Sequence, residues 1–534
     1  MRYSAHVARR LIPALLAGTA LTGFGCSGAS PVAPTEPTVS TGTNALPPST
    51  TPPSATQPTK GPTTAPTTPA ATSSPSTTTG PIQLLDLPSG AQTSFVTRPG
   101  SQLTVVASAA TDSPPASAFR LSVNGATTAN TASAYSLKST TSFPFRSSFT
   151  QTNAALLKHT RHVLDTTTTT AQPARTIGST DQFWINSGDS TTNGDYQETC
   201  VLKAISPHAY FYVDQAATNF TDAQVQQLVD QFENQIYARE TAVFGEPDTL
   251  SNLPDNKLFI VISPAVDDFG KARGVMGYFW SRDVLPDPAP DQHSNQKKAV
   301  FMTDQLFNYP ALTSFGTMAH EFQHLINFSH KAVNTDFSVA EDTWLDEGMA
   351  MYAMEVAGYG LPAGDGLIAK DLDGFEQNPS KYSLTDWSAN PNGFAYGQSY
   401  LFVRYLADRF GQGVIKQLID SPTSGEDSIQ AITEQHGETF GQFFRDWTVT
   451  NLINGTPLAR GTVYNYNNLD LAGNYAGYQL HGFQTMAGSS TNLTANLLPW
   501  GTAYYRFNAP QPQSWSFSLG DGGSSALTGA ALVP

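Results

Sequence analysis

The most chemically informative stretch of the sequence is GTMAHEFQHLINFSH, from Gly316 to His330. His320 and His324 are four positions apart. On a helix, positions i and i+4 project from the same side one turn apart, so both imidazoles can reach one metal ion. Glu321 lies about 100° round the helix from His320. Its carboxylate is then beside the ion, where it can take a proton from a water whose pKa zinc lowers to about 7.

A helix is the structure that this stretch predicts. Thr313 or Ser314 is a candidate N-cap, and the apolar residues that follow recur at the spacing of one helical face. These apolar residues are Met318, Phe322, Leu325 and Ile326. His330 is interpreted as a charge near the helix end that complements the helix dipole. The structural alternative for the histidines is a pair that simply packs in a core.

A catalytic zinc site needs a third protein ligand and leaves its fourth position for water. Glu347 is the candidate, in the stretch AEDTWLDEGMAMYAMEVAGYG. Its distance from His324 along the chain allows a loop and a second helix packed on the first. The neighbouring Glu341 and Asp346 are interpreted as residues that cap or solvate this second helix. Either of them as a substitute ligand is the alternative.

The combination of HEFQHLINF and WLDEGMAMYA resembles the gluzincins, in which a glutamate on a second helix is the third zinc ligand. A finer resemblance, which includes HAYFYVD and GVMGYFWSRD and covers roughly Gln182 to Asn454, is to the hyicolysin family of bacterial zinc metallopeptidases. It implies an α+β zincin (thermolysin-like) catalytic domain with a mixed β-sheet and a helical C-terminal lobe. It also implies one catalytic Zn²⁺ held by His320, His324 and Glu347, with Glu321 as general base and later acid. Structural Ca²⁺ is left open.

The sequence departs from the thermolysin-like pattern at one position near the third ligand. Those enzymes carry an Asp four residues after this ligand to orient a zinc histidine, and here that residue is Met351. Ligating imidazoles nearly always donate their other N–H to a neighbouring group. Asp346 and Glu355 are the candidates for this role.

A hydrogen-bond donor for the oxyanion of the transition state is also expected. Tyr396 starts the predicted helix in GFAYGQSYLFVRYLADRFG and is similar in place to the transition-state tyrosine of gluzincin aminopeptidases. Packing or capping is the alternative for Tyr396, and Tyr352 and Tyr400 are weaker candidates. The aminopeptidase element that holds a free amino terminus is missing, because GVMGYF has Gly277 in place of its glutamate. The resemblance therefore favours an endopeptidase.

The elements that must position these residues form a mixed α/β pattern over residues 173–455. Three apolar runs predict buried strands, and a helix is expected between two of them, from Thr221 or Asp222 to Gly245. The strand candidates are HAYFYVD, KLFIVIS and KKAVFMTD, and the helical lobe is expected to extend through ETFGQFFRDWTVTNLIN. Within this region Cys200 is interpreted as a small buried hydrophobe.

The flanking segments differ in composition from the central region. Residues 1–26 are typical of a secretory signal that ends at Cys26, which resembles the lipidated cysteine of a bacterial lipoprotein. Residues 27–80 are rich in Pro, Thr and Ser and predict a disordered stalk. Residues 81–172 predict a small β module and a helix, with a removable pro-segment as an open alternative. Residues 456–534 predict a C-terminal β module, so all-β modules flank the peptidase domain.

The net charge and the low content of charged residues limit the classes of binding partner. The chain carries a net charge of −15 with only 13 % charged residues, so nucleic-acid binding is not expected. Membrane association is expected only through a lipid anchor at Cys26, and the protein is predicted to be an exported monomer, anchored at a bacterial surface or secreted. Two functions remain at this stage: a zinc endopeptidase acting on proteins or peptides, and an inactive peptidase-like surface adhesion or binding protein.

Overall fold

The computed structural model describes part of the chain. The described residues are 76–77, 83–87, 92–97, 101–111, 117–121, 175–186, 195–250, 253, 255–266, 276–285, 293–387, 393–475, 477–487, 493–509, 513–518 and 527–533. The predictions made for the signal segment, for Cys26, for all but two residues of the stalk and for a helix before residue 172 lie outside them. None of the described helices has the length and apolar character needed to cross a membrane.

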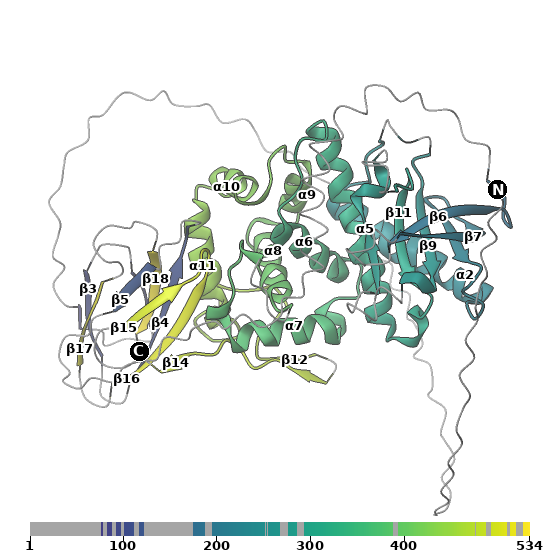
Figure 1. The fold of residues 1–534 in the computed structure, drawn as a ribbon. Helices are drawn as coiled ribbons and strands as arrows, with labels where there is room; N and C mark the ends of the chain where they lie inside the picture. The colour runs from purple at the N-terminus through teal and green to yellow at the C-terminus, as the bar shows by residue number, and fades with distance from the viewer. Residues whose placement is uncertain are drawn as a thin grey trace, which may run out of the picture. The chain divides into compact units, whose positions relative to one another are not determined.

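A six-stranded mixed sheet forms one side of the peptidase region (Figure 1). Three central strands are parallel, and the strands outside them are antiparallel to their neighbours. In order across the sheet they are β10 (Gly277–Phe279), β11 (Lys298–Thr303), β9 (Leu258–Ser263), β8 (Ala209–Asp214), β7 (Asp195–Ile205) and β6 (Thr180–Asn186). Every residue of β9 and β11 is buried, as expected for strands covered on both faces. Cys200 is also fully buried and forms no disulfide with any residue that the structure describes.

The helix predicted between β8 and β9 is confirmed at both ends. It consists of α2 (Asp222–Gln231), a π-helical segment η2 (Phe232–Tyr237) and α3 (Ala238–Phe244). Thr221 and Gln224 form a capping box, which satisfies backbone N–H groups at the start. Gly245 ends the helix with a φ of 94°, in the region that glycine adopts without strain.

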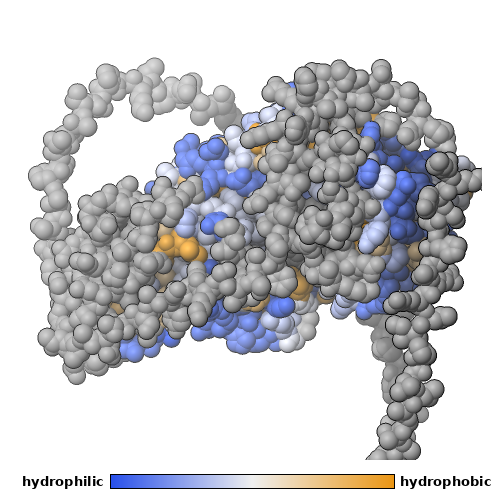
Figure 2. Space-filling view, in the orientation of Figure 1, coloured by the Kyte–Doolittle hydropathy of each residue, from blue (hydrophilic) through white to orange (hydrophobic). Residues whose placement is uncertain are grey.

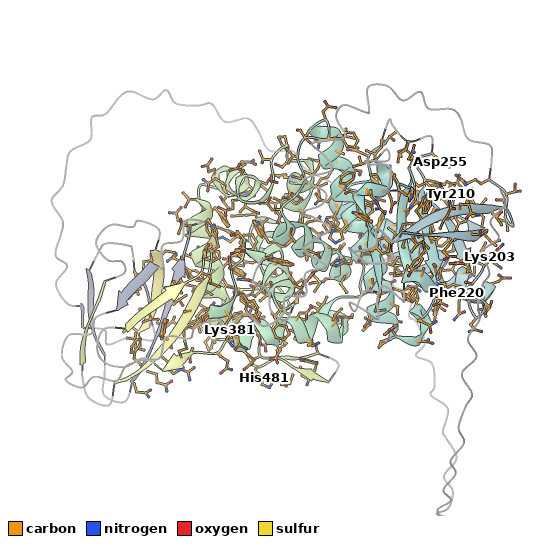
Figure 3. The ribbon with its side chains drawn as sticks, in the orientation of Figure 1. Lys203, Tyr210, Phe220, Asp255, Lys381 and His481 are labelled. Atoms are coloured by element: carbon orange, nitrogen blue, oxygen red, sulfur yellow. The ribbon has the colours of Figure 1, made fainter. Side chains whose placement is uncertain are left out.

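The helices that follow the sheet include the two on which the predicted ligands lie. These are α5 (Ala311–Asn334) and α6 (Thr343–Val356). The others are α7 (Gly366–Gln377), α8 (Ala395–Phe410), α9 (Gly413–Asp420), α10 (Gly425–Gln435) and α11 (Phe440–Ile453). Helix α6 packs between α5 and α8, and side chains fill the spaces among the helices (Figure 3). A Cβ on Gly348 of α6 would lie 2.8 Å from the Ser399 carbonyl oxygen, so glycine permits this close approach to α8.

The cap predicted for α5 is wrong. The helix begins at Ala311, directly after Pro310, and has no side-chain cap. Thr313 and Ser314 therefore lie inside the first turn, where the Ser314 hydroxyl donates to the Leu306 carbonyl at 2.6 Å. The Pro310 carbonyl accepts from the Ser314 N–H at 3.0 Å, but the proline side chain has no oxygen that could accept from the first N–H groups of the helix.

The remaining strands come from both ends of the chain. The early ones are β1 (Ser76–Thr77), β2 (Gln83–Asp86), β3 (Gln92–Thr97), β4 (Ser101–Ala109) and β5 (Ser117–Leu121). The late ones are β14 (Met486–Ala487), β15 (Leu493–Leu497), β16 (Thr502–Ala509), β17 (Gln513–Ser518) and β18 (Leu527–Val533), after a short hairpin of β12 (Asn474–Tyr475) and β13 (Tyr478–Gln479). The two ends were predicted to form separate modules, but early and late strands pair with each other in shared sheets. On the face in Figure 2, the coloured surface is mainly hydrophilic, with small hydrophobic patches.

Candidate metal centre

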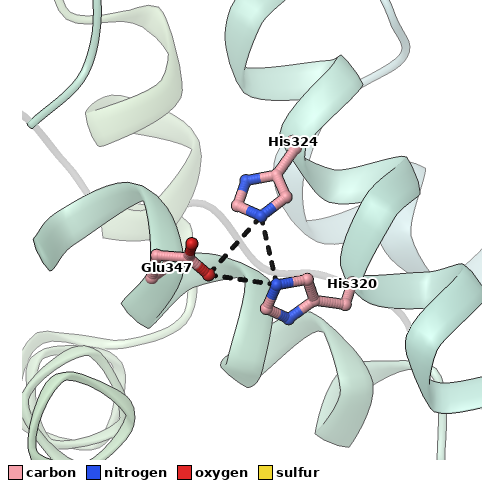
Figure 4. A group of neighbouring side chains, drawn as sticks. All are labelled: His320, His324 and Glu347. Carbon is pink, nitrogen blue, oxygen red and sulfur yellow. Dashed lines mark hydrogen bonds and ion pairs between the residues drawn. The ribbon is translucent and has the colours of Figure 1, made fainter. Parts of the chain in front are cut away.

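Helices α5 and α6 bring together the three side chains that were expected to bind a metal (Figure 4). Glu347 Oε2 lies 3.1 Å from His320 Nε2 and 3.6 Å from His324 Nε2. The two Nε2 atoms are 3.1 Å apart. In the described part of the chain, this is the one group of three or more His, Cys, Asp or Glu side chains whose ligand atoms converge in this way.

These distances fit a tetrahedral ion. Zinc ligands at roughly 2.0–2.1 Å from the metal lie about 3.3 Å from one another in a tetrahedron. Two imidazole nitrogens and one carboxylate oxygen are also ligand types that zinc accepts. The geometry and the chemistry of His320, His324 and Glu347 therefore both suit a single divalent cation.

The site is largely shielded from solvent. The side chains of His320 and His324 are 12 % exposed, and that of Glu347 is 7 % exposed. Burial by itself would raise the pKa of Glu347, but hydrogen bonds and charge from the two imidazoles bring it well below its usual range. Burial would also lower the pKa of His324, but Asp346 and Glu347 raise it well above its usual value. The carboxylates thus favour a positive charge at the point where the ligand atoms meet.

Glu321 lies on α5 beside this group. Its Oε2 accepts a hydrogen bond of 2.8 Å from the backbone N–H of Phe279 on strand β10. Burial raises the pKa of Glu321, and the opposing effects of His320, His324 and the Phe279 N–H are weaker. The carboxyl group is therefore fixed at one oxygen and has a greater affinity for a proton than an exposed glutamate.

Asp346 faces the second histidine instead of capping α6. Its Oδ2 lies 3.1 Å from His324 Nδ1, at ion-pair distance although the ring N–H is not aligned for an ideal hydrogen bond. Asn327, one turn after His324 on α5, donates from Nδ2 to Asp346 Oδ1 at 2.7 Å. Glu355, the other candidate for this role, instead accepts from Arg404 and Tyr400, each at 2.5 Å.

Tyr396 reaches the site from the first turn of α8. Its hydroxyl donates to Glu347 Oε1, at 3.1 Å, while the other oxygen of Glu347 faces the imidazoles. The tyrosine is buried, and its ring packs edge-on against Trp387. The two weaker tyrosine candidates contact other groups: the Tyr352 hydroxyl accepts from Gln412, and that of Tyr400 donates to Glu355.

Two further predictions for this region are wrong. His330 is buried one turn before the end of α5, with Nε2 donating to the Glu246 carbonyl at 2.8 Å and Nδ1 3.0 Å from Asp420. It therefore ties α5 to its neighbours rather than complementing the helix end. Glu341 does not cap α6; it is buried, lies 3.0 Å from Lys331 Nζ and accepts from the Gly425 N–H at 2.7 Å.

Sequence reasoning missed two groups at the site. Asn327 follows His324 by three positions on the same helix, which places it on the same face, so its spacing was an available signal. The Phe279 N–H is a backbone group, and its contact with Glu321 depends on how β10 lies against α5. No residue type at position 279 could have revealed it.

Comparison with known proteins bears directly on this site. Residues 205–464 match the Peptidase M30 family, and this range contains every residue of the site described above. The neutral metalloprotease ShpI of Staphylococcus hyicus is 26% identical over 284 residues, which cover 48% of this chain and 59% of that protein. The chain thus spans about six tenths of its relative's length. Residues 205–464 are thus similar to the Peptidase M30 family, in agreement with the resemblance to the hyicolysin family.

Proposed function

We propose that the protein is a zinc-dependent endopeptidase that hydrolyses protein or peptide substrates outside the cell. The observation that carries the proposal is the convergence of His320, His324 and Glu347, with Glu321 beside them, in a segment similar to the Peptidase M30 family. The fold supports it, because a mixed sheet followed by a helical region agrees with a zincin-like α+β domain.

His320, His324 and Glu347 would hold one Zn²⁺. Held by these residues, it would supply Lewis-acid chemistry, polarising a peptide carbonyl and lowering the pKa of a water to about 7. The two nitrogens and one oxygen form a ligand set of the kind that leaves a fourth coordination position open in catalytic zinc sites. Asp346, next to His324 Nδ1, would fix the orientation of that ring, with Asn327 holding Asp346 in turn.

Glu321 would take the proton of the attacking water and later pass it to the leaving amine. Its Oε2 is held by the Phe279 N–H, which leaves Oε1 to handle the proton. The pKa raised by burial supports the second half of this role, because a carboxyl group that retains a proton briefly can act as an acid. The Tyr396 hydroxyl, close to Glu347, would donate to the oxyanion of the transition state.

Strand β10 supports a peptide as the substrate. Among the described strands it ends the six-stranded sheet, so one of its edges has no strand partner there. The Phe279 N–H points from this strand to Glu321 and not to β11. An extended peptide that pairs with such an edge would run past Glu321. Gly277 on this strand offers no acidic side chain to hold a free amino terminus, which favours internal cleavage.

Action outside the cell is proposed from a segment of the sequence far from the metal centre. It depends on the signal-like residues 1–26 and on Cys26 as a lipid anchor or as the end of a secretory signal. The alternative of an inactive surface-binding protein would need a broken ligand set, whereas His320, His324, Glu347 and the neighbouring Glu321 are all present.

Casein digestion by the wild type and two variants tests the proposal. We expect the wild type to contain about one zinc per chain and to lose activity with a chelator. Glu321→Gln should keep its zinc and its melting temperature but lose about 10²- to 10⁴-fold in kcat, because it removes the proton acceptor. Glu434→Gln, at an exposed position on α10, is the matched control and should match the wild type. Full activity in Glu321→Gln would overturn the proposed mechanism.

A further inference from the structure

The described strands at the two ends of the chain form their shared sheets mainly by pairing with each other. In the five-stranded sheet β4 lies between two late strands, β16 and β18. Its pairing with β16 runs from Ser101↔Ala509 to Ser108↔Thr502. Strand β2 pairs with β18, β3 with β17 and β5 with β15. Each of these ladders joins an early strand to a late one.

Pairing within one end of the chain is very limited. Among the described strands of these sheets, it consists of β14 with β16 and β1 with β3, and each of these ladders covers only two residues. Backbone N–H and C=O groups without a partner are costly to bury, and an exposed strand edge that carries them is prone to aggregation. Neither end therefore contains the partners that it needs to form these sheets alone.

The hydrophobic core beneath the five-stranded sheet is shared in the same way. It takes side chains from both ends of the chain in nearly equal number. The early contributors are Leu87, Leu103, Val105, Ala107 and Ala109, and the late ones are Leu497, Ala503, Tyr505, Phe507, Ala531 and Val533. Alternate residues of β4 point into this core, as the two-residue period of a strand requires. Removal of the early strands would take away about half of its apolar side chains.

The opposite face of the same sheet contacts the peptidase region. The Ser108 hydroxyl lies 3.1 Å from that of Thr448 on α11, and the Tyr504 hydroxyl donates to the Thr448 carbonyl at 2.9 Å. Asp86 forms an ion pair with Arg445 on the same helix. One early and one late strand thus contact the same residue of α11, so the sheet meets the helix as a single unit.

From these pairings we infer that residues 83–121 are a permanent part of the folded protein, the strand partner of residues 486–533, and not a removable pro-segment. A single cut between β5 and β6 then yields two chains that stay together through the shared sheets and core. The inference does not depend on the proposed peptidase activity, because its readout is association of the two pieces.

A full-length chain in which Thr166–Thr170 is replaced by a recognition sequence for a specific protease tests the inference. After cleavage, we expect both fragments to elute together in size-exclusion chromatography under native conditions and to separate only in denaturant. The melting temperature should stay within a few degrees of that of the uncut chain. The inference is overturned if the early fragment dissociates under native conditions while the remainder stays folded and monodisperse.

A pair of substitutions in one strand adds a matched control. Val105→Lys places a charge in the shared core and should reduce co-elution of the cleaved fragments at least tenfold, because Val105 is fully buried and β4 pairs with two late strands, β16 and β18. Gln102→Lys, at an exposed position of β4, should leave co-elution unchanged. Equal co-elution in both variants would contradict a core shared between the fragments.

Discussion

The metal centre and the terminal sheets are held together by different kinds of contact. At the metal centre, side chains from two helices that are close in the sequence meet at one point. Glu347 Oε2 and His324 Nε2 each lie 3.1 Å from His320 Nε2. In the terminal sheets, backbone ladders join strands that are about 400 residues apart, such as β4 and β16. The metal ligands are thus close in the sequence, whereas the terminal sheets form only when strands from the two ends of the chain pair. Substitutions at the site should change activity or metal binding without unfolding the protein. Substitutions in the shared sheets should destabilise the fold without removing a metal ligand.

Tyr396→Phe should give the largest effect among the neighbours of the ligands. If its hydroxyl donates to the oxyanion, kcat should fall about 10²- to 10³-fold while KM, zinc affinity and melting temperature stay unchanged. Steady-state kinetics with a fluorogenic peptide measure this. Tyr352→Phe, whose hydroxyl contacts Gln412, is the control and should retain full kcat. A loss of zinc affinity with little change in kcat would instead make Tyr396 a support for Glu347.

Asp346→Asn should weaken metal binding without a large change in fold. Asp346 faces two donors, His324 Nδ1 and Asn327 Nδ2, and an asparagine has only one carbonyl oxygen to offer them. We expect the zinc dissociation constant, measured by competition with a chromophoric chelator, to rise about 10- to 100-fold. Asp222→Asn, whose side chain is 87% exposed, is the matched control. Equal affinity in both variants would rule out a positioning role for Asp346.

Glu376→Gln should have a smaller effect, on the pH dependence of stability. Glu376 on α7 accepts from the N–H groups of His481 and Gly482, and burial raises its pKa to about 9. Between the ordinary glutamate pKa and about 9, the unfolded chain releases this proton and the folded chain keeps it. The free energy of unfolding should therefore fall as pH rises through this window, by at most about 1.4 kcal/mol per pH unit from this group.

Urea unfolding between pH 5 and pH 8 measures that slope. Glu376→Gln should flatten it, because the amide does not titrate, and Glu434→Gln should leave it as in the wild type. Glu376 joins helix α7 to residues 481 and 482, after α11. The experiment therefore also tests whether this contact depends on pH. Identical slopes in all three proteins would contradict a buried, protonated Glu376.

The difference between the two regions also explains how far the sequence could predict the structure. The helix from Thr221 to Gly245 and the convergence of His320 with His324 follow from short-range rules, namely a capping box, a glycine with positive φ and the i, i+4 spacing. The start of α5 was misplaced because the helix begins directly after Pro310 without a side-chain cap, whereas the prediction looked for a Ser or Thr cap.

Contacts between distant segments were out of reach of those rules. β modules were predicted for residues 81–172 and 456–534, but the partners of their strands depend on register across the whole chain, and each end alone looks like an independent module. The contact of the Phe279 N–H with Glu321 was missed for a related reason, because every residue except proline has a backbone N–H and the residue type does not show which one makes a contact.

X-ray absorption spectroscopy at the zinc edge, on the full-length protein loaded with one equivalent of zinc, tests whether His320, His324 and Glu347 bind one ion. We expect nitrogen and oxygen ligands at about 2.0–2.2 Å, with scattering from two imidazoles, and loss of one oxygen ligand in Glu347→Ala. Sulfur scattering, a single imidazole, or a spectrum that Glu347→Ala leaves unchanged would contradict this ligand assignment.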